Sequence, residues 1–281
     1  MNAYLFALLG SAFVIAPITA ISAGAGGPVP ATALDPSGPW NIDWSDSQCV
    51  AVRSYDLPNR RVSLIVRPSP MGGATQLLVV TDGNRPAMGQ QVAAWVEGGT
   101  QGAIKTSMLA YGISGKKLSV YLTTLTPAQF RTLDGASWLR IAAGSTIDRS
   151  FRVTQLAAVQ AKLGECIADL NKDWLMTPER IARIKVEPTA VGPLSHYFSS
   201  DDYPADAMLQ RNSGQVGVHL MIDEKGIIQD CAIEETSGSA ALDGMTCMIL
   251  RQRAKFKPAI DVDGKPTKSV YGQRVTWKLG F

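Results

Sequence analysis

Residues 215–234 read QVGVHLMIDEKGIIQDCAIE, and this stretch decides the fold of the last part of the chain. From Gln215 onward apolar residues occupy every second position, namely Val216, Val218, Leu220 and Ile222. This period of two predicts a half-buried strand. The turn formers at 223–226 end in a glycine, and a second apolar run follows. Two strands joined this tightly must be antiparallel, so the stretch predicts a β-hairpin.

A helix and a third strand are predicted after the hairpin. Ser239 is a candidate N-cap, and the residues that follow it at three-and-four spacing are Leu242, Met245, Thr246, Ile249 and Leu250. We expect the helix to end at Lys257-Pro258, because the residue before a proline is pushed out of the α region. The alternation from Ser269 to Leu279 predicts the closing strand.

Four cations crowd the far end of the predicted helix: Arg251, Arg253, Lys255 and Lys257. One interpretation is that they offset the partial negative charge of a helix C-terminus. The other is that they bind an anion.

The order helix, strand, turn, strand, helix, strand resembles the C-terminal domain of TonB, the periplasmic protein that grips outer-membrane transporters. The resemblance covers about residues 196–281 and rests on several short matches taken together. Tyr203-Pro204 with Ala205 and Ala207 match the family's Tyr-Pro helix, Lys225-Gly226 its turn, Ser237-Gly238 with Leu242-Asp243 its helix entry, and Phe256-Lys257-Pro258-Ala259 its helix exit. The resemblance therefore implies structural roles for Tyr203, Pro204, Gly226, Leu242, Phe256 and Pro258.

In that family the last strand lies at a sheet edge and pairs with a short extended peptide, the TonB box of an outer-membrane receptor. The resemblance implies that Ser269 to Leu279 is the equivalent surface here, with these peptide-binding residues: Val270, Tyr271, Gln273, Val275 and Trp277. Strand addition gains affinity from main-chain hydrogen bonds and selectivity from alternate side-chain pockets. An ordinary packed strand would show the same alternation, and this alternative stays open.

The chain departs from the family outside this module. Family members begin with a basic stub, a membrane helix that meets an ion-driven inner-membrane partner, and a long proline-rich spacer. Here no Lys or Arg precedes Arg53, and no extended proline-rich tract is present. Residues 199–202 read SSDD where the best-known members carry Gln and Pro, so receptor selectivity does not transfer.

The first 25 residues are expected to direct export. Leu5 to Ala16 is almost wholly apolar, Pro17 interrupts it, and residues 23–25 read AGA, a small-residue cleavage site. We interpret residues 1–25 as a signal peptide, with an uncleaved N-terminal anchor over residues 4–25 as the alternative. Either interpretation predicts that the remaining chain lies outside the cytoplasm, in the periplasm.

The four cysteines are an even number, which an oxidising compartment allows to pair. Three connectivities are open, and the expected domain organisation favours Cys49 with Cys166 and Cys231 with Cys247. The second bridge would join the second hairpin strand to the helix. The alternatives are free thiols in a reducing cytosol, or a metal site of Cys231, Cys247 and His219, whose spacing fits no zinc signature.

Residues 38–174 are long enough for an independent domain of unknown role. Strand-like segments occur at 50–54, 62–67, 76–81, 91–96, 117–122 and 139–142. Thr126-Pro127 predicts the start of a short helix. A longer helix is expected over 152–171, with an apolar stripe of Leu156, Val159, Leu163, Cys166 and Leu170.

The sequence therefore predicts an α+β fold class. An N-terminal, mostly antiparallel sheet with C-terminal helices would precede a small helix-strand-strand-helix-strand domain at 201–281. Residues 175–200 contain Pro178, Pro188 and Pro193 and show little periodicity, which predicts a linker between the two.

Charge and catalytic motifs narrow the function classes. The net charge is +3, and the basic residues are not interleaved with aromatic residues, so we expect no nucleic-acid partner. His196 and His219 are the only imidazoles, in the expected linker and mid-strand. Ser114 and Lys117 have the Ser-x-x-Lys spacing, but the helix N-terminus that this motif requires is not predicted. We therefore predict no enzyme, no cofactor and no metal site.

Two functions from different classes remain. The first is an exported TonB-like protein that binds an extended receptor peptide by strand addition and supports transmembrane transport, with an inner-membrane ion-driven complex as a second candidate partner. The alternative is an envelope scaffold or peptidoglycan-associated structural protein without energy transduction.

Overall fold

The structure is a computed structural model that describes residues 28–279, apart from residues 86–88, 99–101, 114 and 175–176. The expected leader at residues 1–25 and the serine candidate Ser114 lie outside the described residues. The chain divides into two compact units. One comprises Met1–Asp43, Val50–Arg67 and Thr75–Leu163, and the other comprises Trp44–Cys49, Pro68–Ala74 and Gly164–Phe281.

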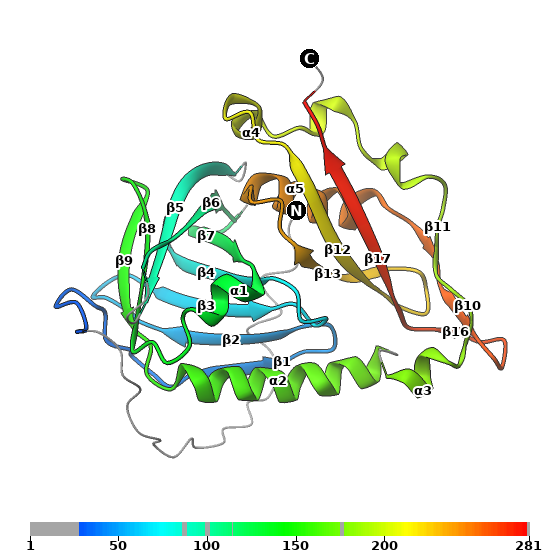
Figure 1. Ribbon diagram of the computed structural model, residues 1–281, viewed down its shortest axis with the longest axis horizontal. Coiled ribbons are helices and arrows are strands. Elements are labelled where there is room, and N and C mark those ends of the chain that lie inside the picture. The colour runs from blue at the N-terminus through cyan, green and yellow to red at the C-terminus, as the bar shows by residue number, and fades with distance from the viewer. Residues whose placement is uncertain (1–27, 86–88, 99–101, 114, 175–176, 280–281) are drawn as a thin grey trace. The chain divides into compact units, whose positions relative to one another are not determined.

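A nine-stranded, mostly antiparallel sheet forms the first unit, in the order β1-β2-β3-β4-β7-β6-β5-β8-β9 (Figure 1). Its strands are β1 (Asn41–Trp44), β2 (Cys49–Ser54), β3 (Val62–Pro68), β4 (Thr75–Asp82), β5 (Gln90–Gly98), β6 (Ile104–Gly112), β7 (Leu118–Leu125), β8 (Trp138–Ala143) and β9 (Ile147–Arg152). Alternate apolar side chains are buried, among them Leu64, Val66, Leu77 and Val79. The sequence predicted six of these strands, and missed β1, β6 and β9.

Two helices accompany this sheet. α1 (Pro127–Arg131) begins at Thr126, whose hydroxyl accepts a 3.2 Å hydrogen bond from the backbone N–H of Gln129, as the Thr-Pro pair predicted. α2 (Leu156–Asp173) buries the expected stripe, and Leu156, Val159, Leu163, Cys166 and Leu170 are each at most 6% exposed. The predicted start of this helix at Arg152 was wrong, because Arg152 is the last residue of β9.

The second unit contains a three-stranded antiparallel sheet in the order β13-β12-β17. The predicted hairpin is β12 (Gly214–Ile222) and β13 (Ile228–Glu235), and the closing strand is β17 (Ser269–Trp277). At the hairpin turn Gly226 has φ +78°, and a Cβ there would lie 2.0 Å from the carbonyl oxygen of Phe256. Only glycine fits this position.

α5 (Ala240–Arg253) covers part of this sheet, against β12 and β13. Its N-cap is Ser239, as predicted, and the Ser239 hydroxyl accepts a 3.4 Å hydrogen bond from the N–H of Leu242. The predicted end at Lys257-Pro258 was wrong. The helix ends at Arg253, and Phe256–Lys257 form the short strand β14, whose partner is a segment far earlier in the chain.

Short elements surround this sheet. They are α3 (Pro178–Ile181), β10 (Ile184–Val186), β11 (Thr189–Ala190), η2 (Leu194–Tyr197), η3 (Ser200–Asp202), α4 (Ala205–Leu209), β15 (Ala259–Asp261) and β16 (Pro266–Thr267). β10 pairs with β15 and β11 pairs with β14. The segment expected as a linker is therefore tied by backbone pairing to residues that follow α5. Within the described part of the chain, no helix is both long enough and apolar enough to cross a bilayer.

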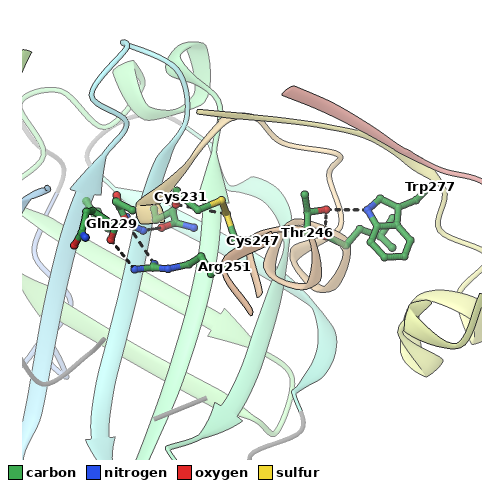
Figure 2. The surroundings of a disulfide bond; sticks show 10 residues. Gln229, Cys231, Thr246, Cys247, Arg251 and Trp277 are labelled. Atoms are coloured by element: carbon green, nitrogen blue, oxygen red, sulfur yellow. Dashed lines mark hydrogen bonds and ion pairs between the residues drawn. A yellow bond between two sulfur atoms is a disulfide. The ribbon is translucent and has the colours of Figure 1, made fainter. Parts of the chain in front are cut away.

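Both cysteine pairs of the favoured connectivity are disulfide-bonded. Cys49 at the start of β2 bonds Cys166 of α2, and Cys231 of β13 bonds Cys247 of α5. Figure 2 shows the second bridge, which joins the hairpin to the helix. The metal interpretation for Cys231, Cys247 and His219 was wrong, because both sulfurs are in a disulfide. The fold class is α+β.

Candidate functional site

β17 is an edge strand of its three-stranded sheet (Figure 1). It pairs antiparallel with β12 along its whole length, from Gly214 opposite Trp277 to Ile222 opposite Ser269. Among the described residues no strand pairs with its other side. Every second N–H and C=O group of β17 is therefore directed away from β12, where an additional strand would bond.

The side chains of β17 alternate between two faces. Tyr271, Gln273 and Val275 are half-buried and lie on the same face as Trp277. Of the expected peptide-binding residues, these three and Val270, on the opposite face, keep partly accessible side chains. Trp277 does not, because it is only 6% exposed.

Trp277 is instead a core anchor at the end of the strand. Its ring packs edge-to-face against Phe198 and Tyr203, with centroid distances of 5.7 Å and 5.3 Å. Its indole N–H donates a 2.8 Å hydrogen bond to the hydroxyl of Thr246 on α5, as Figure 2 shows. Trp277 thus holds β17 against the helix. Its side chain is not available to a peptide at the strand edge.

The opposite face of β17 carries polar contacts. The guanidinium of Arg274 donates to the carboxylate of Glu235 on β13, with a distance of 2.9 Å from Nε to Oε2. Gly272 lies opposite His219 in the β12 register, and a Cβ at Gly272 would be 3.1 Å from Nε2 of that histidine. Nδ1 of His219 is 3.2 Å from Oε1 of Glu234. These groups form a polar surface on the sheet.

A pocket of about 470 Å³ lies beside β17. Tyr271 and Gln273 contribute the strand side of the pocket. The other side is a wall segment, residues 189–195, whose lining residues are Thr189, Ala190, Gly192, Pro193, Leu194 and Ser195. No described residue of β12 lines the pocket, which lies over the face of β17 that carries Tyr271 and Gln273.

Two of the four cations near the end of α5, Arg251 and Arg253, have protein partners. Nη1 of Arg251 is 3.3 Å from Oδ1 of Asp230, and its Nη2 donates a 3.0 Å hydrogen bond to the carbonyl of Gln229 (Figure 2). Arg253 donates two 2.7 Å hydrogen bonds to the carboxylate of Asp202. These bonds, with smaller contributions from Ser199, lower the pKa of Asp202 to about 2. Both arginines thus serve internal contacts.

The motif residues that carried the resemblance have structural positions. Tyr203 donates a 2.5 Å hydrogen bond to the carbonyl of Asn212, and Pro204 is the N-cap residue of α4. Leu242 is fully buried in α5, and Phe256 stacks edge-on against Tyr271 at 5.0 Å. Pro258 lies between β14 and β15.

The start of α5 contains a buried carboxylate, that of Asp243. Asp243 accepts hydrogen bonds from the hydroxyls of Thr236 and Ser237, at 2.5 Å and 2.7 Å, and from the Ser237 N–H. Burial nevertheless raises the pKa of Asp243. This network fixes the start of α5 against the end of β13.

Sequence reasoning missed the wall segment and the Asp202–Arg253 pair. The wall segment was assigned to a linker because its one proline and one glycine interrupt any periodicity. No local signal joins Asp202 to Arg253, which are separated by 51 positions. The backbone pairing of β11 with β14 is equally nonlocal.

Residues 199–279 match the family model described as Gram-negative bacterial TonB protein C-terminal. The matched range includes α4, β12, β13, α5 and β17, the elements that build the three-stranded sheet and its helix. The chain therefore carries a domain similar to the TonB C-terminal domain, of the kind found in envelope proteins. The wall segment lies before the matched range. No curated protein and no solved structure matches the chain.

Proposed function

We propose that this protein binds an extended peptide of an outer-membrane receptor by adding it as a strand to the open edge of β17. The observation that carries the proposal is the position of β17 at the edge of the β13-β12-β17 sheet. The match of residues 199–279 to the TonB C-terminal family supports the class of partner, a peptide of the TonB-box type. Val270, Tyr271, Gln273 and Val275 would contact the peptide, and Trp277 would hold the strand in place.

The backbone of β17 is suited to this role. An edge strand presents a row of N–H and C=O groups that another chain can pair with. The Gln273 side-chain amide donates a 2.6 Å hydrogen bond to the carbonyl of Arg274 within the same strand. Pairing with a peptide backbone would exchange the water or local partners of such groups for main-chain hydrogen bonds, so it would cost little in unsatisfied polar groups.

The cellular setting follows from the same proposal. Residues 1–25 would direct the chain across the inner membrane, and the rest would act in the periplasm, where disulfides such as Cys49–Cys166 persist. The protein would act as a binding protein and not as an enzyme. It would support transport across the outer membrane, with an ion-driven inner-membrane complex as the second partner.

A pair of proline variants tests strand addition. Consecutive residues of an edge strand direct their N–H groups to opposite sides, so one of Arg274 and Val275 has its N–H at the open edge. Proline at that position removes an outer donor, and proline at the other position removes a bond to β12. Fluorescence anisotropy with labelled TonB-box peptides, and thermal unfolding of the full chain, should be measured for Arg274→Pro and Val275→Pro.

We expect one variant to keep a melting temperature close to that of the parent and to lose peptide binding. The other should unfold at a lower temperature, because it loses a ladder hydrogen bond inside the sheet. Binding of no TonB-box peptide by the parent protein would overturn the proposal. Retention of the chain on isolated peptidoglycan, unchanged in both variants, would then favour the envelope scaffold.

A further inference from the structure

We propose that the pocket between β17 and the wall segment is a side-chain subsite that selects an uncharged, apolar residue of the bound peptide. The inference rests on the proposed function, because it assumes a peptide strand along the edge of β17. It adds a specificity element that lies outside the family-matched range, since residues 189–195 precede residue 199.

The position of the pocket relative to the strand supports this assignment. Tyr271 and Gln273 are two positions apart, so both side chains lie on one face of β17. A strand added at the edge would run about 4.8 Å from β17 and would place alternate side chains on that same face. One such side chain would enter the pocket, and its neighbours in the peptide would point to the opposite face.

The volume is adequate for a large side chain. A pocket of about 470 Å³ has room for the side chain of a leucine, methionine or phenylalanine. The ring of Tyr271 is held edge-on against Phe256 at 5.0 Å. This contact fixes one side of the pocket before any peptide arrives.

The wall segment is also held in place. Thr189 and Ala190 pair with Lys257 and Phe256 in the β11–β14 ladder, and the N–H of Val191 donates a 2.7 Å hydrogen bond to the carbonyl of Lys255. Further along, the Tyr197 hydroxyl donates a 2.6 Å hydrogen bond to the carbonyl of Val191. A wall that is already ordered costs little entropy on binding, so the pocket can discriminate between side chains.

The chemistry of the lining defines the residue that fits. None of the eight lining residues carries a formal charge at neutral pH, and Ala190, Pro193, Leu194 and Tyr271 supply apolar surface. A charged peptide side chain would lose part of its water there without gaining a counter-charge, which costs free energy. A leucine, methionine or phenylalanine side chain would gain from burial.

The test uses the full chain and the TonB-box peptide that binds best, in variants that carry Leu, Phe, Glu or Lys at each position in turn. We expect one position at which Leu and Phe bind about tenfold or more tightly than Glu and Lys. Leu194→Glu places a carboxylate in the lining and should reverse the order of the Leu and Lys peptides at that position. Val191→Glu is the matched control, because Val191 belongs to the same segment, is 49% exposed and does not line the pocket.

A second variant covers the case in which Leu194→Glu does not fold. Ser195→Phe adds a ring at an exposed lining position and should weaken binding of the Leu peptide without changing the melting temperature. One outcome would overturn the subsite and leave strand addition intact. Peptides would bind the parent and lose affinity in the proline variant that keeps the parent's melting temperature, yet show the parent's side-chain preference in Leu194→Glu and Ser195→Phe. If no peptide binds the parent, both proposals fail together.

Discussion

The indole N–H of Trp277 at the end of β17 donates a 2.8 Å hydrogen bond to the hydroxyl of Thr246 in the middle of α5. Thr246 is fully buried, and its hydroxyl donates a 2.8 Å hydrogen bond to the carbonyl of Leu242. The Thr246 side chain thus links the edge strand to the backbone of α5 through these two hydrogen bonds. Because Trp277 is also packed by Phe198 and Tyr203, the edge strand is fixed at the end where its pairing with β12 begins.

Thr246→Val should destabilise the protein by about 1–2 kcal/mol, because it leaves the buried indole N–H without this acceptor. Urea unfolding measures the free-energy change. Thr246→Ser keeps the hydroxyl and serves as the control for the hydrogen bond. In a Trp277→Phe background the cost of Thr246→Val should fall, and an unchanged cost would show that the bond contributes nothing to stability.

Asp202→Asn should reduce stability at neutral pH by up to about 1 kcal/mol, because the solvent-exposed Arg253 loses its charged acceptor. The pKa of Asp202 is lowered from its ordinary 3.8 to about 2, so the stabilisation is fully present above pH 4. It is lost as the pH falls from 4 to 2, and the parent and variant stabilities should converge there. Unfolding followed at pH 7, 4, 3 and 2 checks this. The neighbouring exposed carboxylate gives a control, since Asp201→Asn should change little at any of these values.

Removal of the two disulfides should have unequal costs. The Cys231–Cys247 bridge spans 16 positions and the Cys49–Cys166 bridge spans 117. In the chain-entropy model the shorter loop stabilises by about 3 kcal/mol and the longer by about 5 kcal/mol. Thermal unfolding of the paired alanine variants should therefore show the larger loss for Cys49→Ala with Cys166→Ala. The reverse order would mean that local packing outweighs loop length.

Gly226→Ala should destabilise by about 2–4 kcal/mol, since it combines a left-handed backbone with a collision against a carbonyl oxygen. The collision partner is the backbone of Phe256, which cannot move without disturbing β14. Gly264 is a matched control, because it has φ +77° and nothing within 4 Å of the added Cβ. Gly264→Ala should cost only about 1 kcal/mol, and equal losses would argue against the close approach.

Local patterns of the sequence were sufficient for much of the fold. The alternation in 215–222, the turn at 223–226 and the N-cap Ser239 each depend on neighbouring residues, and each was predicted correctly. β9 was not predicted, because its sequence, IDRSFR, breaks the alternation of apolar and polar residues. The start of α2 was placed four residues too early for the same reason.

The end of α5 shows where local rules fail. Proline at 258 sets only the latest point at which the helix can end, but the chain leaves the helix after Arg253 and forms β14. The hydrogen bonds that stabilise β14 come from its pairing with β11, more than sixty residues earlier. A rule based on neighbouring residues cannot predict this pairing. The edge position of the last strand was predicted from the resemblance to the TonB C-terminal family, in which that strand lies at a sheet edge. The pocket wall was not, because it depends on this long-range pairing.

The pairing of β10 with β15 and of β11 with β14 also decides where the chain can be cut. A fragment that starts at residue 199 would retain every element of the family match, yet β14 and β15 would have lost these partners. The backbone N–H and C=O groups of β14 and β15 that these partners satisfied would then be unpaired and could associate with other copies of the chain. A fragment that keeps both ladders must therefore begin ahead of Ile184.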